Sequence, residues 1–424
     1  MSEPQTGSSV TAVDPFARTN AAGNPLIAGG YGRAAYHVGE PSPYAIRGEG
    51  YRMWDHTGRE LIDANGNFTT LIHGNAHPRI VEAAERAIRS GTSWGLPNEG
   101  EWALADELLG RLDGLDQIRF TNSGTEADMA AIRIARSVTG RDDVVMTKDG
   151  YHGSSDVALA SSGPAVGIPK AVSDGVSLVP INDIERLREL FAEGPERYAA
   201  IMLDLLPNKA GLIALDPEFV AEARRLATQH GTLLIIDEVI SIRLGYGGRS
   251  GTYGLVPDLL TTGKLIGGGF AIGAVAGRDE IMSRLDPRRP DEISLSGTFS
   301  GNPVAMAAGL EAVRMLDAPA IDRLNGLGDR AREDAAARVA AVGWEFRGSG
   351  SLLRPFPQGA RKVDAGVQRR LWWAAYDRGV VLSSANLVSL STPMTQEVVD
   401  DVVDRLVDAV TEVATADSTE GSAA

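Results

Sequence analysis

The 424-residue chain contains no cysteine. This absence excludes a disulfide framework, a thiolate metal site and a cysteine nucleophile, and we expect no bound metal. Long apolar runs are also missing, so no segment is long enough to span a membrane. The first ten residues are polar and lack the apolar core of a secretory signal. We therefore expect a cytoplasmic protein without a membrane partner.

Basic residues are in the minority. The sequence has 41 Lys and Arg against 56 Asp and Glu, which gives a formal net charge of −15. Such an excess of negative charge argues against nucleic acids and anionic membranes as partners. The 43% hydrophobic and 23% charged content is typical of a soluble globular protein. Any small anionic substrate would then depend on locally placed basic groups.

Strand-like and helical patterns alternate through the middle of the chain. The strand-like runs lie at residues 117–121, 144–147, 176–180, 199–206, 232–237 and 271–277, and the helical patterns include 125–139, 182–192 and 216–230. This alternation predicts an α/β fold in which helices flank a mostly parallel central sheet. An antiparallel meander over residues 44–67 and the C-terminal third predict a smaller α+β domain.

The expected organisation of the chain has five parts. They are a flexible arm at 1–24, an N-terminal segment of the small domain at 25–75, the large domain at 76–315, the C-terminal part of the small domain at 316–413 and a disordered tail at 414–424. The arm and the tail are assigned from their polar, small-residue composition. The last helix is expected to end near residue 413.

The strongest chemical signal lies between residues 233 and 269. An apolar run ends on Asp237, and a later run of threonines and glycines contains Lys264. A carboxylate at the carboxyl end of a buried strand lies where open α/β sheets bind ligands. A lysine with few polar neighbours loses its proton easily and becomes a nucleophile towards carbonyls. The pair indicates a Schiff base between Lys264 and pyridoxal phosphate, with Asp237 facing the pyridinium nitrogen. Singly, a solvated lysine and a capping aspartate are the alternatives.

Small residues join the strand-like run at 117–121 to the next helix. Ser123, Gly124 and Thr125 leave room for an anion, and a helix start offers unpaired N–H groups and the positive end of a dipole. This arrangement predicts a phosphate site, with a plain N-cap as the alternative. A second hydroxyl-rich helix start, at 296–303, could add phosphate donors from this chain or from a second subunit.

Ring-shaped and apolar side chains follow two of the expected strands. Tyr151 and His152 lie between glycines, and Val239 comes just after Asp237. An aromatic ring at this position can stack on a flat cofactor. Val239 could press on the opposite face of the same cofactor ring. Packing on the protein core is the alternative for each of these side chains.

Five motifs occur in an order that resembles the class III aminotransferases, which are fold-type I pyridoxal-phosphate enzymes. The motifs lie at residues 122–127, 151–153, 237–239, 263–269 and 297–303, and the resemblance covers roughly residues 25–410. Residues 91–95 and 258–264 are most similar to glutamate-1-semialdehyde aminomutases and the β-amino-acid aminotransferases related to them. The resemblance implies a homodimer with its active sites at the interface.

The resemblance also implies roles for individual residues. Lys264 would hold the cofactor and shuttle protons, and Asp237 would pair with the ring nitrogen. The remaining residues that it implies are Ser123, Gly124 and Thr125 at the phosphate, Thr298 at the phosphate across the dimer, and Tyr151 stacked on the ring. His152 and Val239 complete the expected cofactor-binding set from their own positions in the sequence.

Arginines are natural clamps for a substrate carboxylate because their donors match its two oxygens. Arg33 matches the arginine that some β-amino-acid aminotransferases place over that carboxylate, and Arg243 is a second candidate. Trp94 completes the expected substrate-binding set. A surface or ion-paired role is the alternative for both arginines.

The chain departs from the family at three places. Residues 203–209 stand where the family usually has a Glu-Pro pair, residues 379–389 lack the usual arginine or glutamate, and Asn67-Phe68-Thr69 replaces a tryptophan-bearing loop. We therefore predict an aminotransferase that acts on a small amino compound, such as a β-amino acid or a cyclic or sugar-like amine, and a carbonyl acceptor. An aminomutase or epimerase is the alternative, and a non-enzymatic cofactor-binding protein is the third. The roles of Asn208 and Lys209 stay open.

Overall fold

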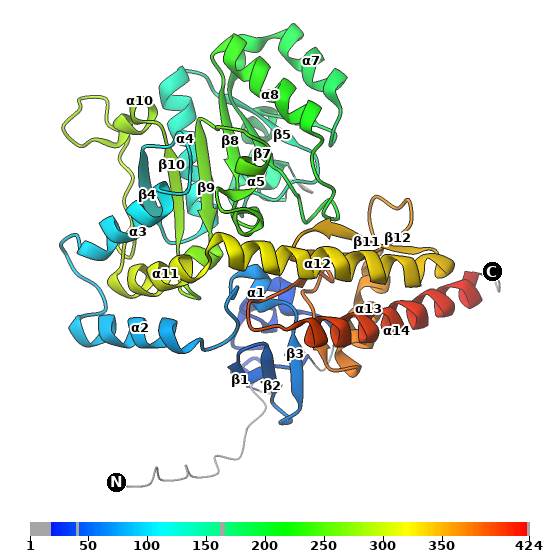
Figure 1. The fold of residues 1–424 in the computed structure, drawn as a ribbon. Helices are drawn as coiled ribbons and strands as arrows, with labels where there is room; N and C mark the ends of the chain where they lie inside the picture. Colours follow the sequence, from blue (N-terminus) through cyan, green and yellow to red (C-terminus); the bar gives the residue numbers. More distant parts are fainter. Residues whose placement is uncertain (1–17, 40–41, 162–165, 422–424) are drawn as a thin grey trace.

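The computed structural model describes residues 18–39, 42–161 and 166–421. Figure 1 shows a large sheet among helices, and the long helices α12 (Ala318–Val339) and α14 (Gln396–Gly421) pack against each other below it. In these described ranges no helix is both long and apolar enough to cross a membrane. The fold is α/β, as the sequence predicts.

Seven strands form the central sheet, in the order β4-β10-β9-β8-β7-β5-β6. Their bounds are Gln117–Thr121 (β4), Asp143–Thr147 (β5), Val176–Val179 (β6), Tyr198–Asp204 (β7), Leu233–Asp237 (β8), Leu259–Gly263 (β9) and Gly273–Gly277 (β10). Strand β10 runs antiparallel to β4 and β9, and the pairs from β9 through β6 are parallel. The expected mostly parallel sheet is confirmed, and β7, β8 and β9 therefore end at one edge.

Helices pack on both faces of this sheet. They include α4 (Gly124–Thr139), α7 (Ile184–Glu193) and α8 (Pro217–His230). Ile201 and Leu234 pack in the apolar cluster of α7 and α8. The next residues, Met202 and Ile235, pack in the cluster of α4. Successive side chains of a strand point to opposite faces, so the continuous apolar runs of the sequence follow from burial on both sides.

Two smaller sheets join distant parts of the chain. One contains β1 (Ala45–Glu49), β2 (Arg52–Asp55), β3 (Glu60–Asp63) and β13 (Val380–Val381), and the other contains β11 (Trp344–Ser349), β12 (Leu352–Pro357) and β14 (Val388–Ser389). The N-terminal meander thus pairs with a C-terminal strand, because β13 lies parallel to β3. The five-part division of the chain stays a prediction.

The remaining helices connect these layers. The longer ones are α2 (Pro78–Ser90), α3 (Glu99–Leu109), α11 (Pro303–Met315) and α13 (Ala365–Asp377), and the short ones are α1 (Gly66–Thr69), α5 (Asp156–Ala160), α6 (Lys170–Asp174), α9 (Gly248–Thr252) and α10 (Asp279–Met282). In Figure 1, α2 and α11 lie close together. Both lie beside the segment that follows β9, and they therefore border the edge that carries the candidate site.

The C-terminal end differs from the prediction. Helix α14 does not stop at residue 413 but continues to Gly421, so the expected disordered tail is wrong over residues 414–421. The physical reason is that no proline or glycine interrupts the sequence between Gln396 and Gly421. Residues 1–17 of the expected arm lie outside the described residues, and Thr19 forms a bridge with Pro25.

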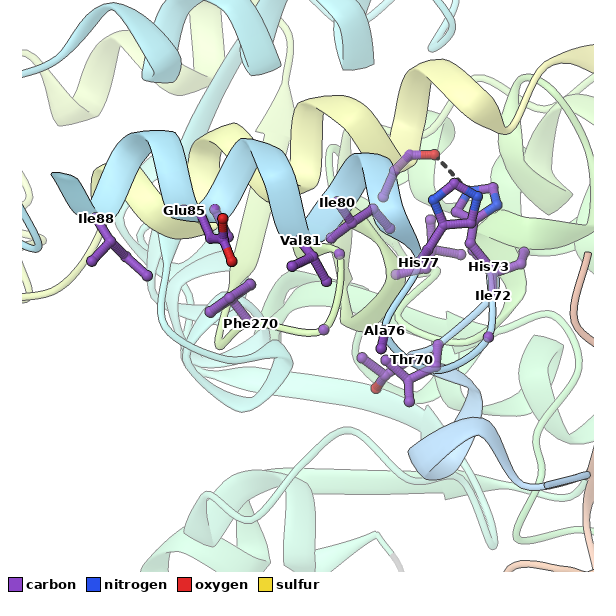
Figure 2. A pocket seen from close by; sticks show the side chains of 17 residues that line it. Thr70, Ile72, His73, Ala76, His77, Ile80, Val81, Glu85, Ile88 and Phe270 are labelled. Atoms are coloured by element: carbon purple, nitrogen blue, oxygen red, sulfur yellow. Dashed lines mark hydrogen bonds between the residues drawn. The ribbon is translucent and has the colours of Figure 1, made fainter. Parts of the chain in front are cut away.

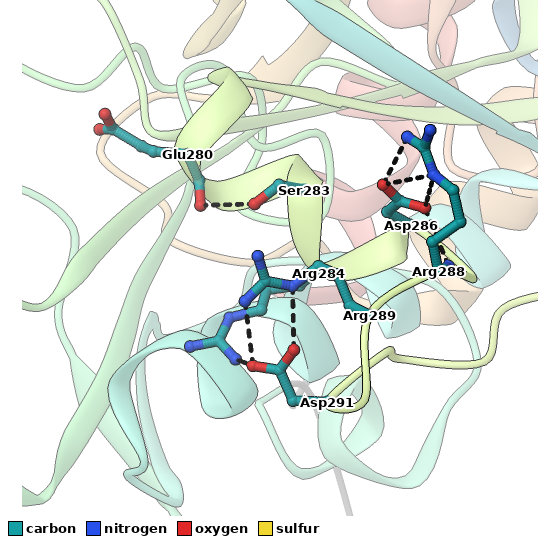
Figure 3. Close-up of polar contacts among 7 residues, drawn as sticks. All are labelled: Glu280, Ser283, Arg284, Asp286, Arg288, Arg289 and Asp291. Carbon is teal, nitrogen blue, oxygen red and sulfur yellow. Dashed lines mark hydrogen bonds and ion pairs between the residues drawn. The ribbon is translucent and has the colours of Figure 1, made fainter.

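Ion pairs on the surface stabilise the turn after α10 (Figure 3). Arg288 donates to both carboxylate oxygens of Asp286, and Asp291 pairs with Arg284 and Arg289. The hydrogen bonds from Arg288 lower the pKa of Asp286 to about 2. Because these pairs are exposed, water and salt screen them, and they contribute little to stability.

Candidate active site

The carboxyl ends of β7 and β8 place two aspartates side by side. Asp204 and Asp237 are paired in register, and Thr261 of β9 pairs with Asp237 on the other side. All three residues are buried. This edge of a parallel sheet is where α/β folds bind their ligands.

Lys264 lies at the same edge, directly after β9. Its backbone φ is +51°, a left-handed conformation that is rare for lysine and recurs at functional sites under strain. Burial lowers the pKa of the Lys264 ammonium, while the charges of three aspartates, Asp237 foremost, oppose that shift. A lysine that gives up its proton easily can attack a carbonyl carbon.

His152 orients the Asp237 carboxylate. Nδ1 of His152 lies 2.8 Å from Oδ2 of Asp237, and Oδ1 of Asp237 accepts a hydrogen bond of 2.9 Å from the Val239 amide. The His152 ring is fully buried, and its Nε2 has no hydrogen-bond partner among the described residues. His152 is thus a hydrogen-bond partner of Asp237. Tyr151 is 48% exposed, so its ring is accessible for stacking.

A third aspartate, Asp128 of α4, completes a buried cluster. It accepts a hydrogen bond of 2.5 Å from the Thr261 hydroxyl, and one of its oxygens lies within 4.8 Å of ligand atoms of Asp237 and His152. Burial and the charge of Asp237 raise the pKa of Asp128 well above its ordinary value. The same two causes raise the pKa of Asp204 to about 7. Neighbouring carboxylates in the interior resist ionising together.

The start of α4 has the features of an anion site. The Ser123 hydroxyl accepts a hydrogen bond of 3.2 Å from the Glu126 amide, so Ser123 is the N-cap. The N–H groups of Gly124 and Thr125 begin the helix and have no acceptor within it. Together with the positive end of a 16-residue helix, they suit a phosphate. The cap and the anion site therefore coexist.

Close backbone approach brings this loop against Val239 and Lys264. A Cβ atom on Gly124 would lie 2.8 Å from the Val239 side chain. A Cβ atom on Gly263, the residue before Lys264, would lie 3.4 Å from the Gly124 nitrogen. No side chain larger than hydrogen fits at Gly124. The phosphate loop, Val239 and Lys264 therefore meet at one site.

The loop that carries Tyr151 joins the same site. A Cβ atom on Gly153 would lie only 2.4 Å from the Thr125 hydroxyl, and the Ser154 amide donates to that hydroxyl at 3.3 Å. Gly153 has a φ of +87°, which also favours glycine. The expected phosphate residue Thr125 and the expected stacking residue Tyr151 thus belong to adjoining loops.

Arg33 approaches the site from the N-terminal segment. Its hydrogen-bond partner belongs to residues 66–71, which pack against the segment after Lys264, because a Cβ atom on Gly269 would lie 3.1 Å from the Leu71 side chain. The charge of Arg33 adds to burial in lowering the pKa of Lys264. Its NH1 atom donates to the Asn67 side-chain oxygen at 3.0 Å, and its guanidinium lies 5.2 Å from the centre of the Tyr36 ring. Arg33 is exposed and is held by a neutral amide.

Arg243 does not reach the site. Only 1% of the residue is exposed, and its guanidinium donates to the hydroxyls of Ser351 at 2.9 Å and Ser389 at 2.7 Å, and to the Leu390 carbonyl. Three interior acceptors make Arg243 part of the core. We therefore correct the expectation that it holds a substrate carboxylate.

Trp94 and Thr298 lie on exposed loops. Trp94 is 46% exposed, and its ring packs against Gly91. A Cβ atom on Gly91 would lie 2.2 Å from the indole nitrogen of Trp94. Thr298 is exposed in a loop that a 3.4 Å hydrogen bond between Asn122 and Ser300 ties to the phosphate loop. In the described part of the chain, no hydrogen bond joins either side chain to Lys264.

A cavity of about 340 Å³ opens between α2 and the segment that follows Lys264 (Figure 2). Val81, Ile88 and Phe270 give it an apolar lining, and His73 and His77 lie at one end. None of the expected cofactor or substrate residues lines it. The cavity is therefore a neighbour of the site rather than the site.

The chain is similar to known proteins along most of its length. A family model described as aminotransferase class-III matches residues 35–411. A glutamate-1-semialdehyde 2,1-aminomutase from Desulforudis audaxviator is 37% identical over 392 residues, which are 87% of this chain and 90% of that protein. The solved structure of an omega-transaminase from Sphaerobacter thermophilus has a TM-score of 0.88 and 36% identity, covering 92% of this chain and 95% of that one. A β-phenylalanine aminotransferase from Variovorax paradoxus has a TM-score of 0.83 and 31% identity, covering 91% and 90%.

Proposed function

The chain belongs to the class III aminotransferases, and from that premise we propose that it moves an amino group between a β-amino acid and a carbonyl acceptor. Pyridoxal 5′-phosphate is its cofactor. The observation that carries the reaction is the half-buried Lys264 at the sheet edge, beside Asp237 and the open start of α4. The similarity to a β-phenylalanine aminotransferase, and an exposed Arg33 whose charge acts on Lys264, support the substrate class. Cyclic or sugar-like amines are the alternative substrates.

The residues of the site fit this cofactor. Because Gly124 and Gly153 have no room for a Cβ atom, the backbone amides at the start of α4 can approach a phosphate closely. The Asp237 carboxylate, held by His152 and the Val239 amide, suits a partner for a protonated ring nitrogen. The proposed contacts are Ser123, Gly124 and Thr125 with the phosphate, Tyr151 and Val239 with the two ring faces, and Thr298 with the phosphate of a second subunit.

Lys264 has two tasks in the proposed reaction. When bound, the cofactor supplies an electron sink that stabilises negative charge on the substrate carbon. The Nζ atom of Lys264 would hold the cofactor covalently. As a free amine, the same atom would take the proton from the substrate carbon and later give it back. Burial favours the neutral amine that this second task needs, because it lowers the pKa of Lys264.

The proposed assembly is a homodimer with its active sites at the interface, in the cytoplasm. Support comes from the apolar face of α2 and the cavity beside it, where Val81 is 40%, Ile88 is 48% and Phe270 is 39% exposed. Contiguous exposed apolar groups of this kind mark interaction surfaces. Thr298 lies on an exposed loop, from which it can contact a second subunit.

An absorbance spectrum of the purified protein tests the proposed reaction. The wild-type protein should show the yellow band of covalently bound cofactor, and Lys264→Ala should abolish it. Lys170→Ala is the matched control and should keep the band, because Lys170 is exposed and pairs with Asp174. Adding a β-amino acid should bleach the band and release a carbonyl product. A wild-type protein that shows no band in excess cofactor would contradict the proposal.

An aminomutase or epimerase is the second candidate. Residues 379–389, which include the buried strand β14, carry no charge where an acceptor-binding arginine is expected. An enzyme that rearranges a single substrate needs no separate acceptor. If the band shifts and returns without release of a carbonyl product, and turnover continues without an acceptor, the second candidate replaces the first.

A further inference from the structure

Residues 66–69 form an unusual backbone run after β3. Gly66, Asn67, Phe68 and Thr69 have φ values of +54°, +48°, +55° and +76°. Three consecutive residues with side chains therefore adopt the left-handed conformation, which is uncommon even for one such residue. A segment keeps this strain only where its surroundings enforce it.

Hydrogen bonds from neighbouring residues enforce the run. Oδ1 of Asp63 accepts bonds from the amides of Asn65 at 3.1 Å and Gly66 at 2.8 Å. The Asn65 side chain accepts a bond of 2.9 Å from the Phe68 amide. Asn75 donates to the other oxygen of Asp63 at 2.9 Å. The run is thus a feature that the fold maintains.

The run presents the Asn67 side chain to Arg33. Oδ1 of Asn67 accepts a hydrogen bond of 3.0 Å from NH1 of Arg33. On another side, the Arg33 guanidinium lies 5.2 Å from the centre of the Tyr36 ring, and that ring lies 6.4 Å from the Phe68 ring. Arg33 is therefore held between an amide and an aromatic ring, and both Asn67 and Phe68 of the strained run take part.

Among the residues that the structure describes, no carboxylate forms an ion pair with Arg33, and its hydrogen-bond partner is a neutral amide. An amide oxygen orients a guanidinium but carries no net charge, whereas a carboxylate would pair with it. The charge of Arg33 reaches Lys264, where it adds to burial in lowering the lysine's pKa. An incoming carboxylate would therefore meet an oriented cation, held by a loop whose Leu71 side chain lies 3.1 Å from where a Cβ atom on Gly269 would be, in the segment after Lys264.

We propose that Asn67 is a specificity-determining positioning residue, which holds Arg33 beside Lys264 so that the guanidinium binds the carboxylate of the amine substrate. The inference rests on the proposed function, since it requires an amine that carries a carboxylate. It adds a reason for substrate specificity. The site prefers amines that carry a carboxylate, because the neutral Asn67 side chain orients Arg33 without competing with that carboxylate for its charge.

Two substitutions at Asn67 separate charge from shape. Asn67→Gly removes the amide but keeps the left-handed backbone, which glycine adopts without strain. Asn67→Asp keeps the shape and places a carboxylate against Arg33, where it competes with the substrate. The probes are 3-aminobutanoate, 2-aminobutane, in which a methyl group replaces the carboxylate, and butanoate, which has no amine.

The expected effect is confined to ligands with a carboxylate. We expect KM for 3-aminobutanoate to rise about 5-fold in Asn67→Gly, because Arg33 loses its neutral hydrogen-bond partner. In Asn67→Asp we expect a rise of about 50-fold, because the new carboxylate competes with the substrate for the charge of Arg33. With 2-aminobutane, both variants should stay within about 2-fold of the wild type. The Kd of butanoate, followed through the absorbance of the bound cofactor, should rise in the same order.

Equal changes with both amines, or an unchanged Kd for butanoate in Asn67→Asp, would overturn the inference. Both variants should keep the wild-type unfolding midpoint and cofactor band; if Asn67→Asp does not fold, Asn67→Gly alone decides. A wild-type band that responds to neither amine sinks the proposed function, while the butanoate titration still decides the role of Asn67.

Discussion

Asp286 and Asp204 both accept hydrogen bonds, but their surroundings shift their acidity in opposite directions. In the exposed turn of Figure 3, the bonds from Arg288 lower the pKa of Asp286 to about 2. At the edge of the central sheet, burial and the charge of Asp237 raise the pKa of Asp204 to about 7, although the Leu206 amide donates to it at 2.9 Å. The difference lies in the neighbouring charge. Asp286 lies beside the cation of Arg288, whereas the buried Asp204 lies beside a second carboxylate, that of Asp237.

Unfavourable electrostatic interactions are concentrated at the edge of the central sheet. Asp128, Asp204 and Asp237 share a buried region with Lys264, and the charge of each carboxylate is unfavourable for the next. Groups with perturbed acidity concentrate at functional sites, whereas exposed ion pairs are screened and belong to the scaffold. Substitutions at four aspartates test this distinction.

Asp237→Asn should have the largest effect, because it removes the carboxylate that we assign to the ring nitrogen. We expect kcat to fall about 10³-fold, while the band of bound cofactor persists because Lys264 is intact. Loss of the Asp237 charge should also lower the pKa of Asp204. Steady-state kinetics with a β-amino acid measure the main effect, and a kcat within about 10-fold of the wild type contradicts the assignment.

Asp204→Asn should change how stability depends on pH. The pKa of Asp204 is raised to about 7 in the folded protein, against about 3.9 in an unfolded chain. The folded state therefore holds a proton whose stabilising effect is complete below about pH 4 and is lost as the pH rises through about 7. Across that window, the free energy of unfolding of the wild type should fall about 1.4 kcal/mol per pH unit more steeply than that of the variant.

Urea unfolding of the cofactor-free protein, repeated from about pH 4 to pH 8, measures this difference in slope. Parallel curves for the wild type and Asp204→Asn would mean that Asp204 titrates like an exposed aspartate.

Asp128→Asn should have a milder effect. Burial and the Asp237 charge raise the pKa of Asp128 well above its ordinary value, which favours its neutral form, and an asparagine can still accept the Thr261 hydroxyl bond. We expect the variant's free energy of unfolding to stay within about 1 kcal/mol of the wild type, and Asp128→Ala to cost about 1–3 kcal/mol because the hydroxyl loses its acceptor. Chemical unfolding compares the two variants, and a larger loss of stability in Asp128→Asn than in Asp128→Ala would contradict a raised pKa for Asp128.

Asp286→Asn should have the smallest effect. The pKa of Asp286 is lowered by the bonds from Arg288, so any stabilisation is present at neutral pH and is lost as the pH falls towards 2. Exposure and salt screening make it small. We expect an unchanged unfolding midpoint and unchanged activity at moderate salt, measured beside Asp204→Asn. An effect as large as that of Asp204→Asn would erase the contrast between the two regions.

Much of the central sheet could be predicted from the sequence, because strands buried on both faces have continuous apolar runs. The run that became β8 ends on Asp237, as expected, and Lys264 follows β9 at the same edge. These two residues lie at the same edge because β8 and β9 are parallel neighbours and both end there. The end of α14 could not be placed, because a polar composition does not by itself stop a helix.

Contacts between distant residues limited the prediction of the site. Asp128 was missed, although an acid among alanines of the buried face of α4 is a usable signal. The sequence offers Arg243 as a candidate substrate clamp, because nothing in it shows that Ser351 and Ser389 accept its hydrogen bonds. The contact between Arg33 and Asn67 likewise appears only in three dimensions.

The central claim is that Lys264, and no other lysine, holds the cofactor. Reducing the wild-type protein with borohydride in the presence of equimolar pyridoxal 5′-phosphate fixes the covalent link, and peptide mass spectrometry then locates it. The account predicts the adduct on Lys264. An adduct on Lys148, Lys170, Lys209 or Lys362 with Lys264 unmodified would contradict it.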